Sequence, residues 1–213
     1  MLGYGLVEYA YYKMALAAGI EMHECQILEE NGRHHFMAKR FDRTDTGDKV
    51  HMQSLGALAH FDYNQPAAYS YEQAFQVLKQ LGLPMSATEQ LFRRMAFNVI
   101  ARNQDDHVKN IAFLMNREGH WSLSPAFDMT YAYDPANKWL GKHQMSLNGK
   151  RDGFVLEDFD DCAKTISLKR GAAKSILTEV QEAVSGWSKI ADEVGVQSDR
   201  SRKIGDTHRR FDL

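Results

Sequence analysis

Residues 103–110 form a short polar segment, Asn-Gln-Asp-Asp-His-Val-Lys-Asn. Asp105 lies five positions before Asn110, the spacing found where a carboxylate accepts a hydroxyl proton and an amide oxygen binds magnesium during phosphoryl transfer. After an apolar run and an expected hairpin, Asp128 adds a further carboxylate, and hard cations such as Mg²⁺ take oxygen ligands. Lys109, inside the segment, can stabilise charge that develops on a phosphate. The combination indicates a phosphoryl-transfer centre.

The same residues also have an ordinary structural interpretation. Asp105, Asp106 and Asn110 could cap and solvate a loop, because an aspartate a few residues before an asparagine is common in loops. The Phe127-Asp128 pair, at a fitting distance beyond the hairpin, is what favours function. For His107, the sequence favours bracing of backbone carbonyls over a reactive role.

Two further features have competing interpretations. Arg40-Phe41-Asp42-Arg43 follows an expected strand, and the pattern alone favours an ordinary strand exit with surface charge. Glu8, on the first expected helix, could pair with a lysine that positions ATP. From the pattern alone, a solvated helix face is the better explanation.

The composition is that of a globular protein. Of the 213 residues, 44% are hydrophobic and 25% charged, enough for one substantial core or for a small lobe beside a larger one. The net charge of −2 predicts neither direct nucleic-acid binding nor attachment to a membrane surface. The two cysteines cannot form a disulfide framework and fit a reducing compartment. We find neither a signal-peptide pattern nor a run of about twenty apolar residues, so we expect a cytoplasmic protein.

The first part of the chain is expected to hold one helix and a strand pair. Apolar residues at helical spacing predict a helix over residues 6–18, with Gly19 as its stop. Residues 25–28 and 34–41 are expected strands, and the Asn31-Gly32 pair between them is a hairpin turn signal.

The pattern then becomes helical. Residues 54–61 are a short candidate helix. Ser70 and Gln73 predict a capping box for a helix that reaches about residue 81. Ser86 and Glu89 predict a second cap, for a helix that continues to about residue 100.

The rest of the chain combines a hairpin with further helices. The pattern predicts a hairpin from residues 111–115 and 120–123, an irregular stretch over 124–150, and helices over 156–165 and 172–192. The expected fold class is therefore α+β and mostly α-helical.

Together these residues resemble the HipA family of bacterial serine/threonine kinases, the toxins of toxin–antitoxin pairs. The resemblance covers essentially the whole chain and depends on segments that occur in the family's order, namely Glu8-Tyr9, Lys39–Arg43, Asn98–Asn110, Leu123–Asp128 and Met145–Lys150. It implies a protein-kinase-like C-lobe in residues 46–213. Residues 1–45 would be a remnant of the N-lobe, with its helix, strand pair and hinge.

The resemblance also implies roles for individual residues, with ATP and Mg²⁺ as cofactors. The implied catalytic residues are Asp105 as general base, with Lys109 and His107 supporting the loop. The implied metal ligands are Asn110 and Asp128. The implied hinge, which would receive the adenine mainly through main-chain groups, consists of Lys39, Arg40, Phe41 and Asp42.

The partners implied by the resemblance are a protein substrate, which is an aminoacyl-tRNA synthetase in the best-known members, and a small DNA-binding antitoxin. The family places a phosphate-binding loop and a strand lysine before the first helix, whereas only seven residues precede Glu8 here. We therefore expect the isolated chain to be a weak or inactive kinase, as a truncated protein, a natural remnant or a polypeptide that another chain completes. The alternatives are a silent remnant that binds an antitoxin or partner chain, a small-molecule phosphotransferase and a metal hydrolase.

Overall fold

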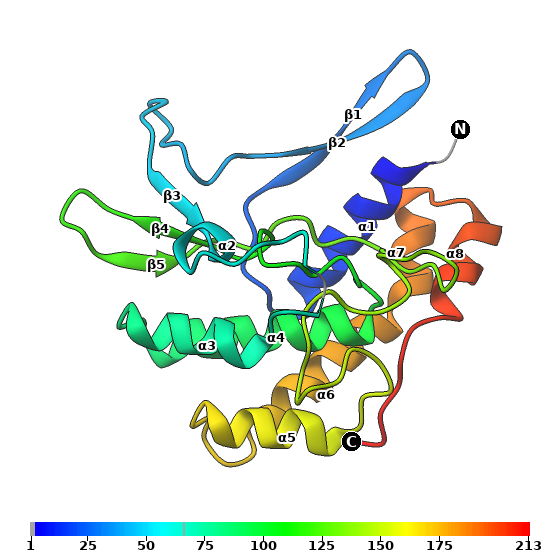
Figure 1. Cartoon of the computed structure of the whole chain (residues 1–213). Coiled ribbons are helices and arrows are strands. Elements are labelled where there is room, and N and C mark those ends of the chain that lie inside the picture. Colours follow the sequence, from blue (N-terminus) through cyan, green and yellow to red (C-terminus); the bar gives the residue numbers. More distant parts are fainter. Residues whose placement is uncertain (1–2, 66) are drawn as a thin grey trace.

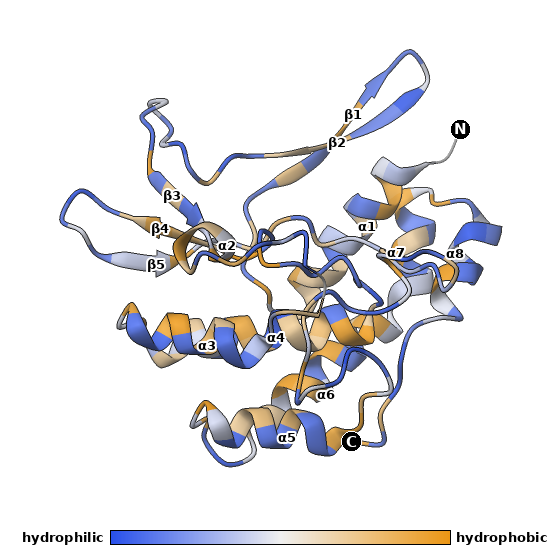
Figure 2. Cartoon of the chain, viewed as in Figure 1, coloured by the Kyte–Doolittle hydropathy of each residue, from blue (hydrophilic) through white to orange (hydrophobic). Residues whose placement is uncertain are grey.

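The structure, a computed structural model, describes residues 3–65 and 67–213 and places two small antiparallel sheets beside a group of helices (Figure 1). The first sheet is the hairpin of β1 (Cys25–Glu30) and β2 (Arg33–Ala38). Asn31 and Gly32 between them have φ values of 49° and 69°, as a tight two-residue turn requires. The predicted hairpin is confirmed, and its far end is hydrophilic (Figure 2).

Helix α1 (Tyr4–Ala17) packs against this hairpin. It ends before Gly19, whose φ is 73°, so the predicted helix and its stop are confirmed. The approach of helix to strand is close at Gly5, where a Cβ atom would lie 2.5 Å from the backbone oxygen of His34. A glycine therefore allows α1 to lie directly on β2.

The second sheet has the strand order β3-β4-β5, formed by β3 (His51–Ser54), β4 (Ala112–Met115) and β5 (Trp121–Leu123). The β4–β5 hairpin is confirmed. The sequence does not predict β3, because this strand pairs with a segment far along the chain and its own residues alternate weakly. The helix expected over residues 54–61 is shorter, α2 (Leu55–Leu58), with the Ser54 hydroxyl accepting a hydrogen bond from Ala57 N at 3.1 Å.

Helices α3 (Tyr71–Gln80) and α4 (Met85–Ile100) follow. The capping box of Ser70 and Gln73 is present, which confirms that prediction. The predicted cap at Ser86 is wrong. Pro84 is the N-cap, in an extended conformation, so α4 starts two residues earlier than predicted and Ser86 lies inside its first turn.

Four helices make up the C-terminal part: α5 (Leu156–Thr165), α6 (Ala172–Ser185), α7 (Trp187–Val194) and α8 (Ser198–Gly205). The first matches its prediction. The continuous helix expected over residues 172–192 is wrong, because Gly186 ends α6 and begins α7. Glycine is a poor helix former, and the following Trp187 is 3% exposed with its indole N–H donating to Ser201 O at 2.8 Å. The break between the two helices therefore coincides with the burial of this side chain.

The core lies between the helices, with α4 packed against α6 and α1 against α7. Tyr11 of α1 is fully buried, and its ring packs edge-on against Phe97 and Trp187. Figure 2 shows the matching apolar faces of these helices. No helix within residues 3–65 and 67–213 is long and apolar enough to cross a membrane.

Candidate active site

The polar segment of residues 103–110 runs from the end of α4 to the start of β4. Its first residues are tied by backbone hydrogen bonds to the chain that follows Asp128. Gln104 N donates to Ala132 O at 3.0 Å, and Ala132 N donates to Arg102 O at 3.1 Å. This pairing brings the two polar segments singled out in the sequence next to each other.

Asp105 lies in the segment with its side chain 45% exposed, and Asn110 holds its main chain. Asn110 Nδ2 donates to Asp105 O at 2.9 Å, and Asn110 N donates to His107 O at 2.9 Å. Burial raises the pKa of the Asp105 carboxyl, His107 opposes this, and the negative charges of Asp128 and Asp106 raise the pKa further. A carboxylate with a raised pKa accepts a proton more readily near neutral pH.

Asp128 is exposed and has a φ of 56°. Residues other than glycine are uncommon in this backbone region, and such strain clusters at functional sites. The buried side chain of Asn103 donates from Nδ2 to Asp128 O at 3.4 Å. The strained residue is therefore held directly by the polar segment that carries Asp105.

Glu8 of α1 lies near the same place. Burial raises the pKa of Glu8 to about 7, and the charge of Asp128 contributes to the rise. Glu8 is half-buried, so the sequence prediction of a solvated helix face is wrong. The helix therefore brings the Glu8 carboxylate near that of Asp128.

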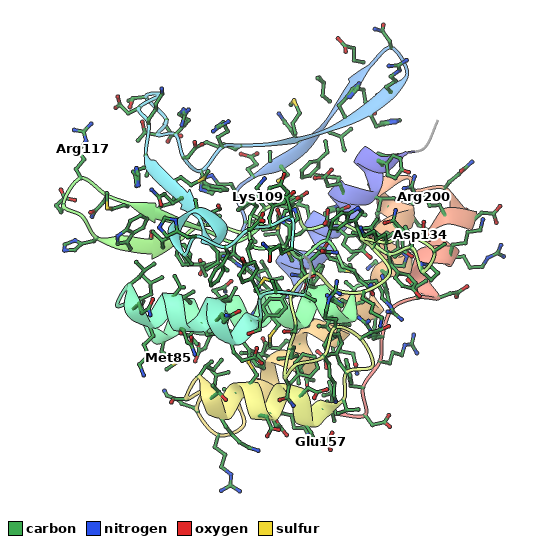
Figure 3. The ribbon with its side chains drawn as sticks, in the orientation of Figure 1. Met85, Lys109, Arg117, Asp134, Glu157 and Arg200 are labelled. Atoms are coloured by element: carbon green, nitrogen blue, oxygen red, sulfur yellow. The ribbon has the colours of Figure 1, made fainter. Side chains whose placement is uncertain are left out.

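Lys109 and His107 both contact the ring of Tyr63, which lies in the loop between α2 and α3. Lys109 Nζ is 3.1 Å from the ring centroid, a cation–π contact, and Figure 3 shows Lys109 near the middle of the view. The His107 ring packs edge-on at 6.1 Å, and its Nε2 is 4.0 Å from Asp105 Oδ1. The expectation that His107 braces backbone carbonyls is wrong, because its buried Nδ1 has no hydrogen-bond partner among the described residues.

The four predicted hinge residues, 39–42, follow β2 and line a cavity of about 220 Å³. Phe41 packs against Phe127 with ring centroids 5.4 Å apart, so the cavity also touches the segment that carries Asp128. Further walls are formed by the apolar side chains of Met22, Phe36, Met52 and Met129. A flat apolar ring system would fit such a space.

The charged hinge side chains stabilise the local chain. The Asp42 carboxylate accepts hydrogen bonds from Arg40 Nε at 2.7 Å and Arg40 NH2 at 2.6 Å, and the hydrogen bonds from Arg40 lower the pKa of Asp42 against the opposing effect of burial. Lys39 Nζ donates to Asp45 Oδ1 at 2.7 Å. These side chains therefore pair among themselves, whereas the Phe41 ring forms part of the cavity wall.

The oxygen atoms of Asn110 and Asp128 are compatible with magnesium. The part of the chain that the structure describes contains no group of three or more His, Cys, Asp or Glu side chains able to hold a metal ion. Mg²⁺ does not need one, because it is commonly bound by one or two protein oxygens together with water and substrate phosphates. Asn110 uses its Nδ2 in a hydrogen bond, which leaves Oδ1 as a ligand, and Asp128 is exposed. These two residues fit an ion that arrives with a phosphate.

Sequence reasoning missed the role of Asp106, the neighbour of Asp105. Its side chain is buried and accepts three hydrogen bonds, from Tyr71 OH at 2.7 Å, His143 Nδ1 at 2.8 Å and Gln144 N at 2.7 Å. Asp106 is therefore a structural anchor of the segment. The pair of adjacent acids was a signal, but no spacing in the sequence points to His143, which lies in the irregular stretch.

Comparison with known proteins identifies relatives of this chain. The family described as HipA-like C-terminal domain matches residues 3–187. A curated protein of Sinorhizobium fredii (strain NBRC 101917 / NGR234), named "Putative kinase Y4mE", is 25% identical over an alignment of 213 positions. The alignment covers 92% of this chain and 50% of that protein. The chain thus spans about half the length of this curated relative.

Two solved structures share the fold. A chain of the Shewanella oneidensis MR-1 toxin–antitoxin complex of HipA, HipB and operator DNA matches with a TM-score of 0.76 and 17% identity, over 94% of this chain and 52% of that chain. The Helicobacter pylori proinflammatory kinase CtkA matches with a TM-score of 0.57 and 13% identity, over 95% of this chain and 88% of that chain. The fold is therefore α+β and kinase-like, as the sequence predicted.

Proposed function

The chain belongs to the family of HipA-like C-terminal domains, and on this basis we propose that it is the catalytic module of an ATP- and Mg²⁺-dependent serine/threonine kinase. One observation carries the proposal. The segment with Asp105 and Asn110 and the segment with Asp128 are hydrogen-bonded together beside an apolar cavity. Residues 46–213 form the C-lobe in this proposal, and residues 1–45 form part of the N-lobe.

The cavity next to residues 39–42 is the proposed adenine site. The base lies between Phe41 and the methionine side chains of the opposite walls, where its faces are removed from water. In residues 3–65 and 67–213, the peptide groups of Arg40 and Phe41 form no backbone hydrogen bond, so they are free to bind the polar edge of the base. Lys39 N is already used, since it donates to Glu24 O at 2.9 Å.

The phosphates then extend from this cavity toward Asp128, which lines it. Asn110 Oδ1 and the Asp128 carboxylate would hold Mg²⁺, which would neutralise negative charge on the phosphate oxygens when bound. Lys109, whose Nζ is held over the Tyr63 ring, is the proposed cation that contacts the transferred phosphoryl group. The hydrogen bonds that fix Asn110 to Asp105 O and Asn103 to Asp128 O keep the ligands in place before the nucleotide arrives.

Asp105 is the proposed general base. A serine or threonine hydroxyl donates a hydrogen bond to its carboxylate, and the proton passes to Asp105 as the oxygen attacks the terminal phosphorus. The raised pKa of Asp105 favours this transfer. His107, 4.0 Å from the carboxylate, supports the charge that Asp105 carries before the proton moves.

The proposed substrate and regulator are those that the family resemblance implies. We propose a protein hydroxyl as acceptor, with an aminoacyl-tRNA synthetase as the candidate substrate, and a small DNA-binding antitoxin as the regulator, so that the kinase would act in the cytoplasm as a toxin. The similarity to a chain crystallised in a complex with HipB and operator DNA supports the antitoxin assignment.

Calorimetry with MgATP tests the nucleotide site. The protein should bind MgATP, and Asp128→Asn should weaken this binding by at least about tenfold, because one ion ligand loses its charge. Asp105→Asn should bind MgATP as the wild type does but transfer no phosphate to protein hydroxyls. Asp134→Asn is the matched control, since Asp134 caps the Ala136 turn and lies away from Lys109 (Figure 3).

Failure of MgATP to bind, or binding that Asp128→Asn leaves unchanged, would contradict the kinase proposal. The chain would then be better explained as an impaired remnant that docks an antitoxin or a partner chain. ATP hydrolysis without any phosphorylated protein product would instead indicate a hydrolase.

A further inference from the structure

The C-terminal segment, residues 208–213, has no regular secondary structure and runs from the end of α8 toward α5 as a strap (Figure 1). Backbone groups fix its course at both ends. Arg209 N donates to Ile100 O at 2.9 Å, and Phe211 N donates to Gln181 Oε1 at 2.7 Å. Ile100 is the last residue of α4, directly before the proposed catalytic loop, so the strap passes the point where that loop begins.

The Arg209 side chain turns inward from this strap and is 11% exposed. It donates to Val99 O at 2.6 Å, to His143 Nε2 at 3.0 Å and to Gln104 Oε1 at 3.3 Å. Asp152 Oδ1 accepts a further hydrogen bond from its NH2. Burial lowers the pKa of Arg209, and the charge of Arg102 lowers it further, while Asp152 acts against both.

The contact with His143 fixes the state of the imidazole. A guanidinium has only donors, so His143 Nε2 must be the acceptor and the ring hydrogen must be on Nδ1. That hydrogen is donated to Asp106 Oδ2 over 2.8 Å. The His143 side chain is fully buried, so no solvent competes with either bond.

Arg209 therefore reaches both neighbours of Asp105. It contacts Gln104 directly and Asp106 through His143. Gln104 is in turn held by its backbone to Ala132, on the segment that follows Asp128.

We propose that Arg209 is a positioning residue for the catalytic loop, which holds Asp105 in place from both sides through Gln104 and through the His143–Asp106 pair. This inference rests on the proposed kinase function for the meaning of Asp105, but the geometry of the loop does not depend on it. A purely packing role would not need a buried cation, because an apolar side chain of similar length would fill the space without desolvating a charge. The fork of the guanidinium, by contrast, can serve several acceptors at once.

The first test is amide hydrogen exchange, measured by mass spectrometry, in the wild type, Arg209→Met and the control Arg210→Met. Methionine keeps the length of the stem but has no donors, and Arg210 is the exposed next residue. Arg209→Met should speed exchange in the peptides that cover residues 103–111 by at least about tenfold, the effect of losing a hydrogen bond from a charged group. Exchange in α6 should stay unchanged, and Arg210→Met should match the wild type in all peptides.

Arg209, His143 and Asp106 form a relay of two side-chain contacts, and two substitutions of His143 each remove one of them. Asn places an amide nitrogen near the position of Nδ1 and can still donate to Asp106, whereas Gln places an amide oxygen near the position of Nε2 and can still accept from Arg209. Each keeps one half of the relay, so each should raise exchange in residues 103–111, and Arg209→Met should add to His143→Asn only the part that the Gln104 contact contributes. In the wild type, ¹⁵N NMR should show the hydrogen of His143 on Nδ1, where the Asp106 carboxylate accepts it.

Kinetics complete the test. Arg209→Met should lower kcat by about tenfold or more while the Kd for MgATP changes less than about twofold, because the hinge cavity does not include Arg209. Arg209→Lys, which keeps the charge and part of the donor set, should recover part of kcat.

The outcomes are distinguishable. Unchanged exchange in residues 103–111 together with faster exchange in the strap alone would overturn the proposal. Faster exchange everywhere, α6 included, in Arg209→Met and both His143 variants would also overturn it, since Arg209 would then serve only global stability. Loop exchange as expected in a protein that transfers no phosphate would leave Arg209 as the positioning residue and overturn the kinase proposal instead.

Discussion

Protonation of His208 should destabilise the fold as the pH falls. His208 lies in the C-terminal strap, next to Arg209, with its Nε2 3.0 Å from Tyr11 OH. The Tyr11 hydroxyl donates to Ala101 O at 2.7 Å, so its oxygen accepts a hydrogen bond from His208 Nε2–H. The neutral imidazole satisfies this arrangement, and the ring also packs against Trp187 with centroids 5.7 Å apart.

The size and sign of the effect follow from the pKa. Burial lowers the pKa of His208 from the usual 6.5 to about 4, with help from the positive charges of Arg102 and Arg210. A depressed pKa means that the unfolded chain binds the proton more tightly, so the contribution to stability is complete above pH 6.5 and is lost as the pH falls toward 4. A difference of about 2.5 pKa units, at roughly 1.4 kcal/mol each, gives about 3.5 kcal/mol, of which about 3 kcal/mol is lost between pH 7 and pH 4. That is a large share of the roughly 5–15 kcal/mol that stabilises a typical domain.

Urea denaturation at a series of pH values between 7 and 4 measures this effect. The wild type should lose about 3 kcal/mol more than His208→Gln over this range, because glutamine does not titrate and the carboxylates common to both proteins cancel in the comparison. His120→Gln, at an exposed position on the β4–β5 turn, should follow the wild-type curve. Parallel curves for the wild type and His208→Gln would refute the reasoning.

Two further predictions concern the packing of α1 on β2 and the contact between Tyr63 and Lys109. Gly5→Ala should destabilise the protein by about 1–3 kcal/mol in urea denaturation, because the new Cβ would lie 2.5 Å from His34 O and must push α1 from β2. Helix propensity alone predicts a gain in stability, and such a gain would contradict the close packing. Tyr63→Leu should lower phosphoryl transfer about two- to fivefold through loss of the cation–π contact with Lys109, whereas Tyr63→Phe keeps the ring and should retain the wild-type rate; equal rates in the two variants would show that the ring does not act on Lys109.

Local signals in the sequence predict much of this fold. The Asn31-Gly32 turn and the Ser70–Gln73 capping box depend on neighbouring residues, and the structure confirms both. Strand β3 and the break at Gly186 depend on distant partners. The first needs β4 as a neighbour, and the second needs the buried site that receives Trp187. Periodicity within one segment carries no information about either.

In the candidate site, too, contacts between residues close in sequence were predictable and contacts between distant residues were not. Asp105 and Asn110 are close in sequence, and their spacing together with the Phe127-Asp128 pair indicated that they could act together, as the bond from Asn110 Nδ2 to Asp105 O supports. The relay from Asp106 through His143 to Arg209 joins residues more than a hundred positions apart, and nothing local marks them as partners. Sequence reasoning could therefore name the residues of the loop but not those that hold it.

The carboxylates of Glu8 and Asp105 support the proposed chemistry through raised pKa values, which the sequence alone does not reveal. Burial and mutual repulsion raise the pKa of Glu8 to about 7 and raise that of Asp105. Both groups therefore make the folded state less stable as the pH rises through their pKa values. A protein that keeps such a cluster half-buried accepts a cost in stability, which a divalent cation bound beside Asp128 would offset. On this argument Mg²⁺ should stabilise the protein more at pH 8 than at pH 5, because the charge of Asp128, the proposed metal ligand, contributes to the raised pKa of both Glu8 and Asp105.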